Sequence, residues 1–194
     1  LTGASRTPIE AALDSLVSAR LVSRLGRGRY SVRPEDISMD VLAKLQALPQ
    51  TVRFRYGLGA IPKPPGSLLS RVDHLLHVGR PGPWNEDVYL SGVAGAYAGR
   101  HDMDLMGVPR VDLVMHVRSK EGFATSLMRD LDDSLEPDRS PLDPAPVVVT
   151  LVHGARITES ASSAKVASPG DIFLSMIDRG LKGPAMEYIK GHMS

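Results

Sequence analysis

Two β-forming runs separated by helix-forming segments constrain the fold of this chain more than any other feature. The runs are RVDLVMHV (110–117) and PVVVTLV (146–152), and both are rich in the apolar β-branched residues that strands favour. Helical periodicity marks the segments 68–77, 88–99, 121–133, 169–180 and 184–191. This alternation predicts a mixed α/β or α+β fold, in which the proline- and charge-rich segment 133–146 is a loop.

The N-terminal segment reads as an amphipathic helix with a marked start. Apolar residues recur at helical spacing from residue 9 to residue 21 and form one stripe. Ser5 is a candidate N-cap with Pro8 in the first turn, or Thr7 is the cap and Glu10 completes a capping box. Either choice places residues 5–7 at the helix N-terminus, where free N–H groups suit phosphate oxygens and short side chains reach base edges.

A cationic hairpin is predicted directly after this helix. β-favouring residues flank Gly26-Arg27-Gly28, and glycine supplies the positive φ that tight turns require. Arg24, Arg27 and Arg29 alternate along the hairpin, so they are expected to project from one face. There they would neutralise phosphates or enter a minor groove.

The stretch SRTPIEAALDSLVSARLVSRLGRGRY resembles the recognition helix and wing of bacterial winged-helix repressors, especially GntR-type regulators. The resemblance implies that residues 1–38 are a winged helix-turn-helix domain that binds double-stranded operator DNA. The first helix of the motif is absent, so we expect further residues upstream of Leu1. Winged helices also act as protein-binding modules, but arginine at both the helix start and the wing favours DNA. The expected DNA-binding residues are Ser5, Arg6, Thr7, Glu10, Arg24, Arg27 and Arg29.

Charge is divided unevenly along the chain. Residues 1–33 carry a net charge of +4 and the remainder −3, within a total of +1. A basic head on a mildly acidic body is expected when one module meets phosphate and the other meets something else. The chain has no cysteine, no long apolar run and no export leader, so we expect neither disulfides nor a membrane span, and a cytoplasmic location.

The second domain is predicted to span residues 39–194. Residues 34–39 break the basic run, and the segment 40–50 reads as a helix that ends near Pro49 and bridges the two modules. The proline-rich stretch 62–66 is expected to be a stiff surface loop.

Three catalytic or metal-binding patterns were weighed for this second domain. Asp102 and Asp104, with Asp112, resemble the magnesium-binding carboxylates of nucleotidyltransferases, but the glycine-serine pair of that family is Gly92-Val93 here. His74 and His77 are spaced like the start of a metal site, yet a third ligand is not evident. The chain has no G-x-S-x-G motif for a serine hydrolase. We therefore expect no enzyme activity, no catalytic residue, no metal and no cofactor.

A second resemblance covers nearly the whole chain. The order of winged helix, linker, VYLSGVAGAYAG, two strands, Val166-Ala167-Ser168-Pro169 and an apolar helix is similar to antitoxins of the AbiEi family. It implies a protein that represses its own operon and neutralises an AbiEii-like nucleotidyltransferase toxin, with Ser168 and Pro169 capping the apolar helix. The residues alone fit equally well a one-component regulator with a ligand-sensing second domain. They leave the oligomeric state open.

Overall fold

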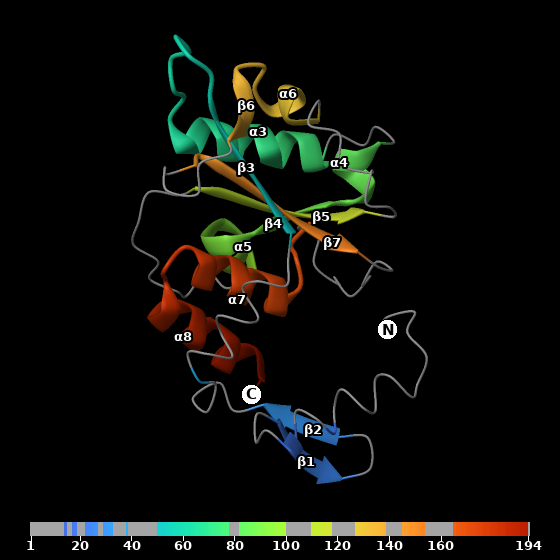
Figure 1. Cartoon of the computed structure of the whole chain (residues 1–194). Helices are drawn as coiled ribbons and strands as arrows, with labels where there is room; N and C mark the ends of the chain where they lie inside the picture. The colour runs from blue at the N-terminus through green and yellow to red at the C-terminus, as the bar shows by residue number, and fades with distance from the viewer. Residues whose placement is uncertain are drawn as a thin grey trace.

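The computed structural model of the chain contains a β-hairpin and a larger layered body (Figure 1). The body is built from one five-stranded sheet with helices on both of its faces. The residues that the structure describes are 14, 17–18, 22–26, 29–32, 38, 50–77, 82–99, 110–117, 127–138, 145–153 and 165–193.

The sheet is mixed, with the strand order β4-β5-β7-β3-β6. Among the five described strands of this sheet, β5 and β7 run parallel, with Val111 opposite Val147, and the other neighbouring strands pair antiparallel. The strands are β3 (Gln50–Tyr56), β4 (Val88–Ser91), β5 (Val111–Val117), β6 (Leu135–Asp138) and β7 (Val147–His153). The expected mixed α/β class is confirmed.

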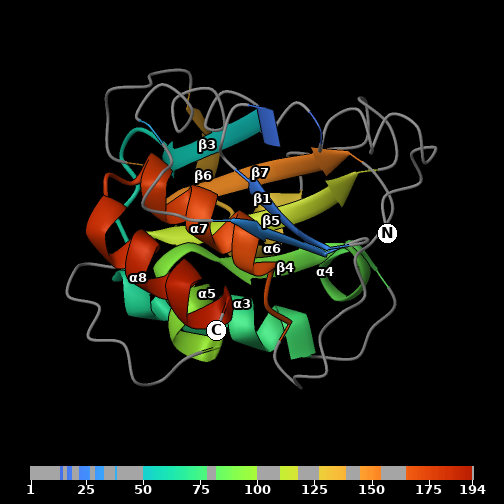
Figure 2. The same cartoon turned by 90° about the horizontal axis from the view of Figure 1, so that it is seen from below.

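Helices cover the two faces of the sheet and complete a three-layer body. Three lie on one face: α3 (Pro65–His77), α4 (Pro83–Glu86) and α6 (Leu127–Leu131). The opposite face carries α5 (Gly92–Gly99) and α7 (Pro169–Asp178), and α8 (Lys182–Met193) packs against α7. Figure 2 looks onto this second face and shows α5, α7 and α8 in front of the strands.

The core is divided by the sheet into two apolar clusters. Leu113 of β5 packs with Phe54, Leu68 and Met128 on the α3 side, and Val114 packs with Met176 on the α7 side. Because both faces of β5 are covered, six of its seven residues are buried. A strand covered on both faces reads in sequence as a continuous apolar run, which is why the segments 110–117 and 146–152 were predicted correctly.

Helix α7 begins as the sequence indicates. The Oγ of Ser168 accepts a hydrogen bond from the Asp171 backbone N–H at 3.2 Å and donates one to the Asp171 Oδ2 at 2.6 Å. Pro169 occupies the first turn, where a missing N–H costs nothing. The predicted serine-proline cap is confirmed.

The two outer strands of the sheet, β4 and β6, each have a feature that limits pairing at the outer edge. Along β4, the backbone N–H of Leu90 donates to the Lys165 carbonyl and the N–H of Ala167 donates to the Leu90 carbonyl, each at 2.8 Å. Val166 thereby forms a parallel bridge with Leu90. At the other side, β6 carries Pro137 opposite Phe54. Proline has no N–H to donate and is tolerated at such an edge.

Three expectations for the body were wrong in detail. The segment 88–99 is not one helix, because its first four residues form β4 and only Gly92–Gly99 is helical. The segment 133–146 is not entirely a loop, because Leu135–Asp138 pairs with β3 as an edge strand. The strand β3 itself, Gln50–Tyr56, was not expected.

The N-terminal part of the chain contains the hairpin and the predicted linker. The strands β1 (Val22–Gly26) and β2 (Arg29–Val32) form a separate two-stranded sheet. Asp14, Val17 and Ser18 are helical, as predicted, while the rest of that helix and the linker helix predicted for 40–50, up to Pro49, lie outside the described residues. Within the described part of the chain, none of the helices has the length and apolar character needed to cross a bilayer.

Candidate nucleic-acid interface and buried carboxylate site

The two strands of the hairpin form where the sequence predicts them. β1 and β2 pair antiparallel, with Val22 opposite Val32 and Arg24 opposite Tyr30. The register shifts between Arg24 and Gly26, at the point where the strand approaches the turn. Val22 is buried, whereas the rest of β1, including Arg24, is exposed. The predicted hairpin is therefore confirmed, and it presents a cationic side chain to solvent.

The expected DNA-binding residues are described only in part. Arg24 lies on β1, and Arg29 begins β2 opposite Gly26, so the hairpin brings these two arginine positions onto neighbouring strands. The others lie outside the described residues. They are Ser5, Arg6, Thr7, Glu10 and Arg27.

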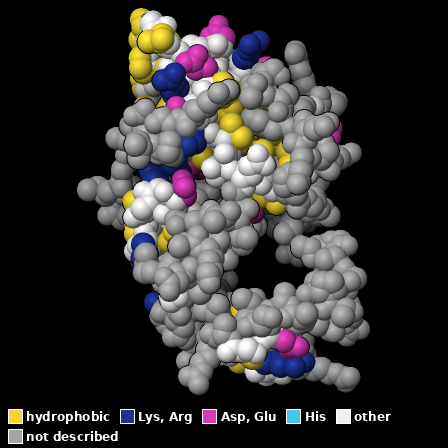
Figure 3. All heavy atoms as spheres, viewed as in Figure 1, with side chains coloured by type: hydrophobic (Ala, Val, Ile, Leu, Met, Phe, Trp, Pro, Cys, Tyr) yellow, Lys and Arg dark blue, Asp and Glu magenta, His cyan; other side chains and the backbone are white. Residues whose placement is uncertain are grey.

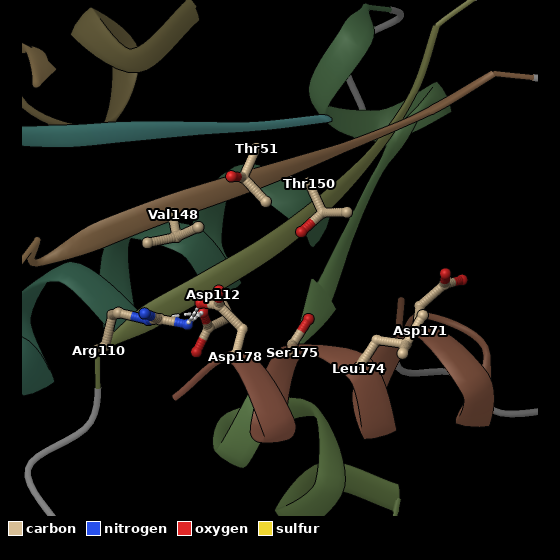
Figure 4. Close-up of a pocket in the computed structure, with 9 residues that line it drawn as sticks. All are labelled: Thr51, Arg110, Asp112, Val148, Thr150, Asp171, Leu174, Ser175 and Asp178. Carbon is tan, nitrogen blue, oxygen red and sulfur yellow. Dashed lines mark hydrogen bonds and ion pairs between the residues drawn. The ribbon is translucent and has the colours of Figure 1, made fainter. Parts of the chain in front are cut away.

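A second candidate site joins the start of β5 to the end of α7. The Arg110 guanidinium contacts Asp112 Oδ1, with Nε at 2.8 Å and Nη2 at 2.6 Å, and Nη2 donates to Asp178 Oδ2 at 2.9 Å (Figure 4). The side chain of Asp112 is 1 % exposed and that of Asp178 is 40 % exposed. One arginine thus bridges a buried carboxylate and a half-buried one.

Burial governs the electrostatics of this site. It raises the pKa of the Asp112 carboxyl above its ordinary value, although the neighbouring Arg110 pulls it down. Burial also lowers the pKa of Arg110, but Asp112 and Asp178 more than compensate and leave that pKa raised. Burial, together with the charge of Arg110, lowers the pKa of Arg179. Arg110 is therefore the cation that most strongly opposes the effect of burial on the pKa of Asp112.

The backbone of Gly92 lies directly against Asp112. Gly92 has φ +58°, and a Cβ built on it would lie 2.8 Å from both Cβ and Cγ of Asp112 and closer still to Oδ2. That Oδ2 is buried without a hydrogen-bond partner among the described residues. The carboxylate therefore sits at the N-terminus of α5, where the helix dipole favours a negative charge.

The cavity beside this cluster is small. Its volume is about 20 Å³, which is room for about one water molecule. Ser175, one of its lining residues, shares a hydrogen bond of 3.0 Å with the hydroxyl of Ser91. The lining residues are Thr51, Arg110, Asp112, Val148, Thr150, Asp171, Leu174, Ser175 and Asp178 (Figure 4). The arrangement suits an ordered water and an internal ion pair rather than a bound metabolite.

The residues considered for catalysis or metal binding fall in different places. Asp112, the third carboxylate of the nucleotidyltransferase pattern, is held by Arg110 inside the body, while Asp102 and Asp104 lie outside the described residues. His77 on α3 contacts Asp73 one turn earlier, with Nδ1 2.8 Å from its carbonyl and 3.2 Å from its carboxylate, and His74 is exposed. Across the described ranges, His and acidic side chains do not gather in groups of three or more able to hold a metal.

A larger hollow lies between α3 and the α6–β6 turn, with a volume of about 450 Å³. At its mouth, Lys63 Nζ lies 2.8 Å from Asp132 Oδ2, and Ser134 donates to Asp132 Oδ1 from its N–H and its hydroxyl at 3.0 and 2.6 Å. Burial alone would raise the pKa of Asp132, but the hydrogen bonds from Lys63 and Ser134 prevail and lower it to about 2. Asp132 is thus a fixed anion that holds Lys63 in place.

Of the residues that build these two sites, the sequence pointed to Asp112 as a candidate magnesium ligand, but not to Arg110, Asp178, Lys63 or Asp132. Arg110 and Asp112 stand two apart on a strand, which puts both on one face, so their pairing was readable. Asp178 and Lys63 approach their partners from 68 and 69 residues away, and no local pattern carries that information.

Taken together, the described residues offer an exposed arginine-bearing hairpin, a closed ion-pair cluster and an open charged hollow. Among known proteins, no family model, curated protein or solved structure matches the chain.

Proposed function

We propose that this chain is a DNA-binding repressor whose body binds a protein partner, as an antitoxin of the AbiEi kind does. In this proposal it represses its own operon and neutralises a nucleotidyltransferase toxin. The observation that carries the proposal is the arginine-bearing hairpin, β1–β2, which forms a sheet of its own.

The hairpin supports DNA binding through its charge and its exposure. Arg24 is exposed on β1, and Arg29 starts the neighbouring strand. Phosphate contacts from such side chains supply the sequence-independent part of DNA affinity and make it fall with salt. The net charge of +4 over residues 1–33 strengthens this argument.

The two cavities among the described residues argue for a protein partner rather than for a small ligand. The cavity beside Asp112 has room for about one water molecule, and a metabolite site usually has about 300–1,000 Å³. The hollow beside Lys63 is large enough at about 450 Å³, but charged residues of both signs line it, and small-molecule sites are mostly apolar. We therefore favour the antitoxin over a ligand-sensing regulator.

DNA binding is tested with the full chain and a fluorescent duplex from the region upstream of its own gene. Arg24→Ala should weaken binding to every duplex alike and lower the slope of log affinity against log salt by about 0.9, the value for one lost phosphate contact. Arg55→Ala is the matched control, because Arg55 is half exposed in the body and pairs with Glu136. Equal affinities for the wild type, Arg24→Ala and Arg55→Ala would show that the hairpin is not part of the DNA interface.

The antitoxin assignment predicts that a gene adjacent to this one encodes a nucleotidyltransferase, and co-expression with that enzyme tests partner binding. The full chain should relieve growth arrest caused by that enzyme. Arg24→Ala should relieve it equally well, because the proposal assigns the hairpin to DNA and the body to the toxin. Failure of the wild-type chain to restore growth would refute the antitoxin assignment while leaving the DNA-binding result intact.

A further inference from the structure

Leu25 is an exposed aliphatic side chain near the end of β1. It is 68 % exposed, whereas Val22, three residues earlier in the same strand, is 7 % exposed. The other exposed residues of β1 are Ser23, Arg24 and Gly26, so Leu25 is the one exposed apolar side chain of this strand. A single leucine among polar and cationic residues is smaller than the contiguous apolar patch that marks a protein interface.

The pairing of the hairpin distinguishes Leu25 from the residues beside it. Arg24 lies opposite Tyr30 and Gly26 lies opposite Arg29, so two steps along β1 correspond to one step along β2. Leu25 is therefore the extra residue of a β-bulge. A bulge bends its strand and re-aims a side chain, and bulges are frequent next to functional sites.

The surroundings of Leu25 leave it room to enter a narrow space. β1 ends at Gly26, one residue later, and a Cβ built on Gly26 would meet none of the described atoms within 4 Å. Leu25 thus lies next to a residue without a side chain, close to the point where the chain crosses from β1 to β2. The minor groove of B-DNA is only about 6 Å wide, so it admits slender elements of this kind.

Positive charge accompanies this leucine. Arg24 precedes it and is exposed, Arg29 begins the opposing strand, and residues 1–33 carry a net charge of +4. In Figure 3, dark blue cationic side chains and small areas of yellow hydrophobic ones lie at the end of the view where Figure 1 places β1. Phosphates attract such cations, and leucine is one of the apolar residues that proteins insert between base pairs from the minor groove.

We propose that Leu25 is an apolar wedge, which enters the minor groove, separates two stacked base pairs and kinks the DNA while Arg24 contacts a flanking phosphate. This inference rests on the DNA binding proposed above and adds to it a way for the hairpin to recognise sequence. Pyrimidine–purine steps are the easiest to unstack and kink. The wedge therefore gives the hairpin a preference for TA or CA steps without any hydrogen bond to a base.

The bend of the bound duplex tests the wedge. The full chain is added to the upstream duplex, which carries a donor and an acceptor fluorophore at its two ends, and energy transfer reports the distance between them. The wild type should shorten this distance, as a kink of about 20–90° does. Leu25→Ser should leave the bound duplex nearly straight. It should not change the slope of log affinity against log salt, because no phosphate contact is lost.

Three further variants separate the wedge from charge and from hydrophobicity in general. Leu25→Met keeps a long apolar side chain and should retain the bend. Arg24→Ala should retain the bend but lower the salt slope by about 0.9. Leu58→Ser is the matched control, since Leu58 is a fully exposed leucine of the body, and it should change neither bend nor affinity. The substituted side chains are all exposed, so melting curves should resemble that of the wild type.

The preferred base step is tested on duplexes that differ at one step only. Permanganate oxidises unstacked thymines faster than stacked ones, so its reactivity locates the step that the wild type opens. Leu25→Ser should remove this reactivity. Replacing the opened step by a stiff AA step should weaken binding of the wild type about 10-fold. The same replacement should leave the affinity of Leu25→Ser unchanged.

Two outcomes would overturn the wedge alone. They are a duplex that stays straight when the wild type binds it, and a bend that Leu25→Ser retains. If the second outcome is accompanied by loss of relief from the toxin in Leu25→Ser, Leu25 belongs to a protein contact instead. Absence of DNA binding by the wild type would overturn the proposed DNA-binding function and the wedge with it.

Discussion

Replacing Gly92 by alanine should destabilise the body in two ways, through backbone strain and through a clash of the added methyl group. Gly92 adopts φ +58° at the junction of β4 and α5, a conformation that costs a side chain about 1–2 kcal/mol. The new methyl would also lie 2.8 Å from Cβ and Cγ of Asp112, a side chain with 1 % exposure. Asp112 cannot simply move aside, because Arg110 holds its carboxylate and α5 covers it.

The size of the effect follows from adding these terms. Overpacking a buried position typically costs about 1–3 kcal/mol. Together with the backbone strain, Gly92→Ala should lower the free energy of unfolding by about 2–5 kcal/mol. For a chain of 194 residues, each kcal/mol shifts the melting temperature by roughly 2–4 °C, so Tm should fall by roughly 4–20 °C.

Thermal and urea unfolding followed by circular dichroism measure this loss, and Gly180→Ala is the control. Gly180 has φ +81° with open space around it, so its alanine variant reports the backbone strain alone. In an Asp112→Gly background the clash is gone, and Gly92→Ala should cost no more than Gly180→Ala. If Gly92→Ala melts within about 2 °C of Gly180→Ala in the wild-type background, the close approach to Asp112 does not constrain the fold as we argue.

Three further perturbations probe the charged network and the helix cap. Arg110→Met leaves Asp112 buried beside Asp178 without its cation, so stability should fall by about 3–5 kcal/mol at neutral pH, and by less in acid, where Asp112 is protonated. The Asp132 carboxyl has its pKa lowered from 3.8 to about 2, so its stabilisation is present above pH 3.8 and disappears as the pH falls toward 2. Urea unfolding between these pH values should show a loss of about 1 kcal/mol, small because Lys63 is half exposed, and Asp132→Asn should abolish it. Ser168→Ala removes the N-cap of α7 and should cost about 1 kcal/mol in the same assay.

Strands buried on both faces were predictable from local sequence, and the outer strands were harder. β5 and β7 are rich in apolar, mostly β-branched residues, which favour a strand buried on both faces. In β3, Val52 and Phe54 alternate with Thr51 and Arg53. This period of two is typical of a strand, but the arginines make the segment look like a surface segment. β6 contains Pro137, which demotes a strand prediction although an edge tolerates it.

The boundary between β4 and α5 illustrates a limit of local patterns. Alanine and glycine from position 92 onward favour no sharp start, and the helix begins there because Gly92 adopts a positive φ against Asp112. That contact joins residues 20 apart. The ion pairs of Arg110 with Asp178 and of Lys63 with Asp132 depend on tertiary packing in the same way. The hairpin, by contrast, is local chemistry, and it was predicted from its own glycines.

The two edges of the sheet have a consequence for how this molecule meets others. Main chain from residues 165–167 already pairs with β4, and Pro137 interrupts the donors of β6 at the opposite edge. Among the described residues, each border strand has four residues, and short edge strands are one of the devices by which proteins limit edge-to-edge aggregation. Recognition by β-augmentation is disfavoured for the same reason. Side chains rather than strand edges then determine what this body binds. Single substitutions can therefore change its specificity without disturbing the sheet.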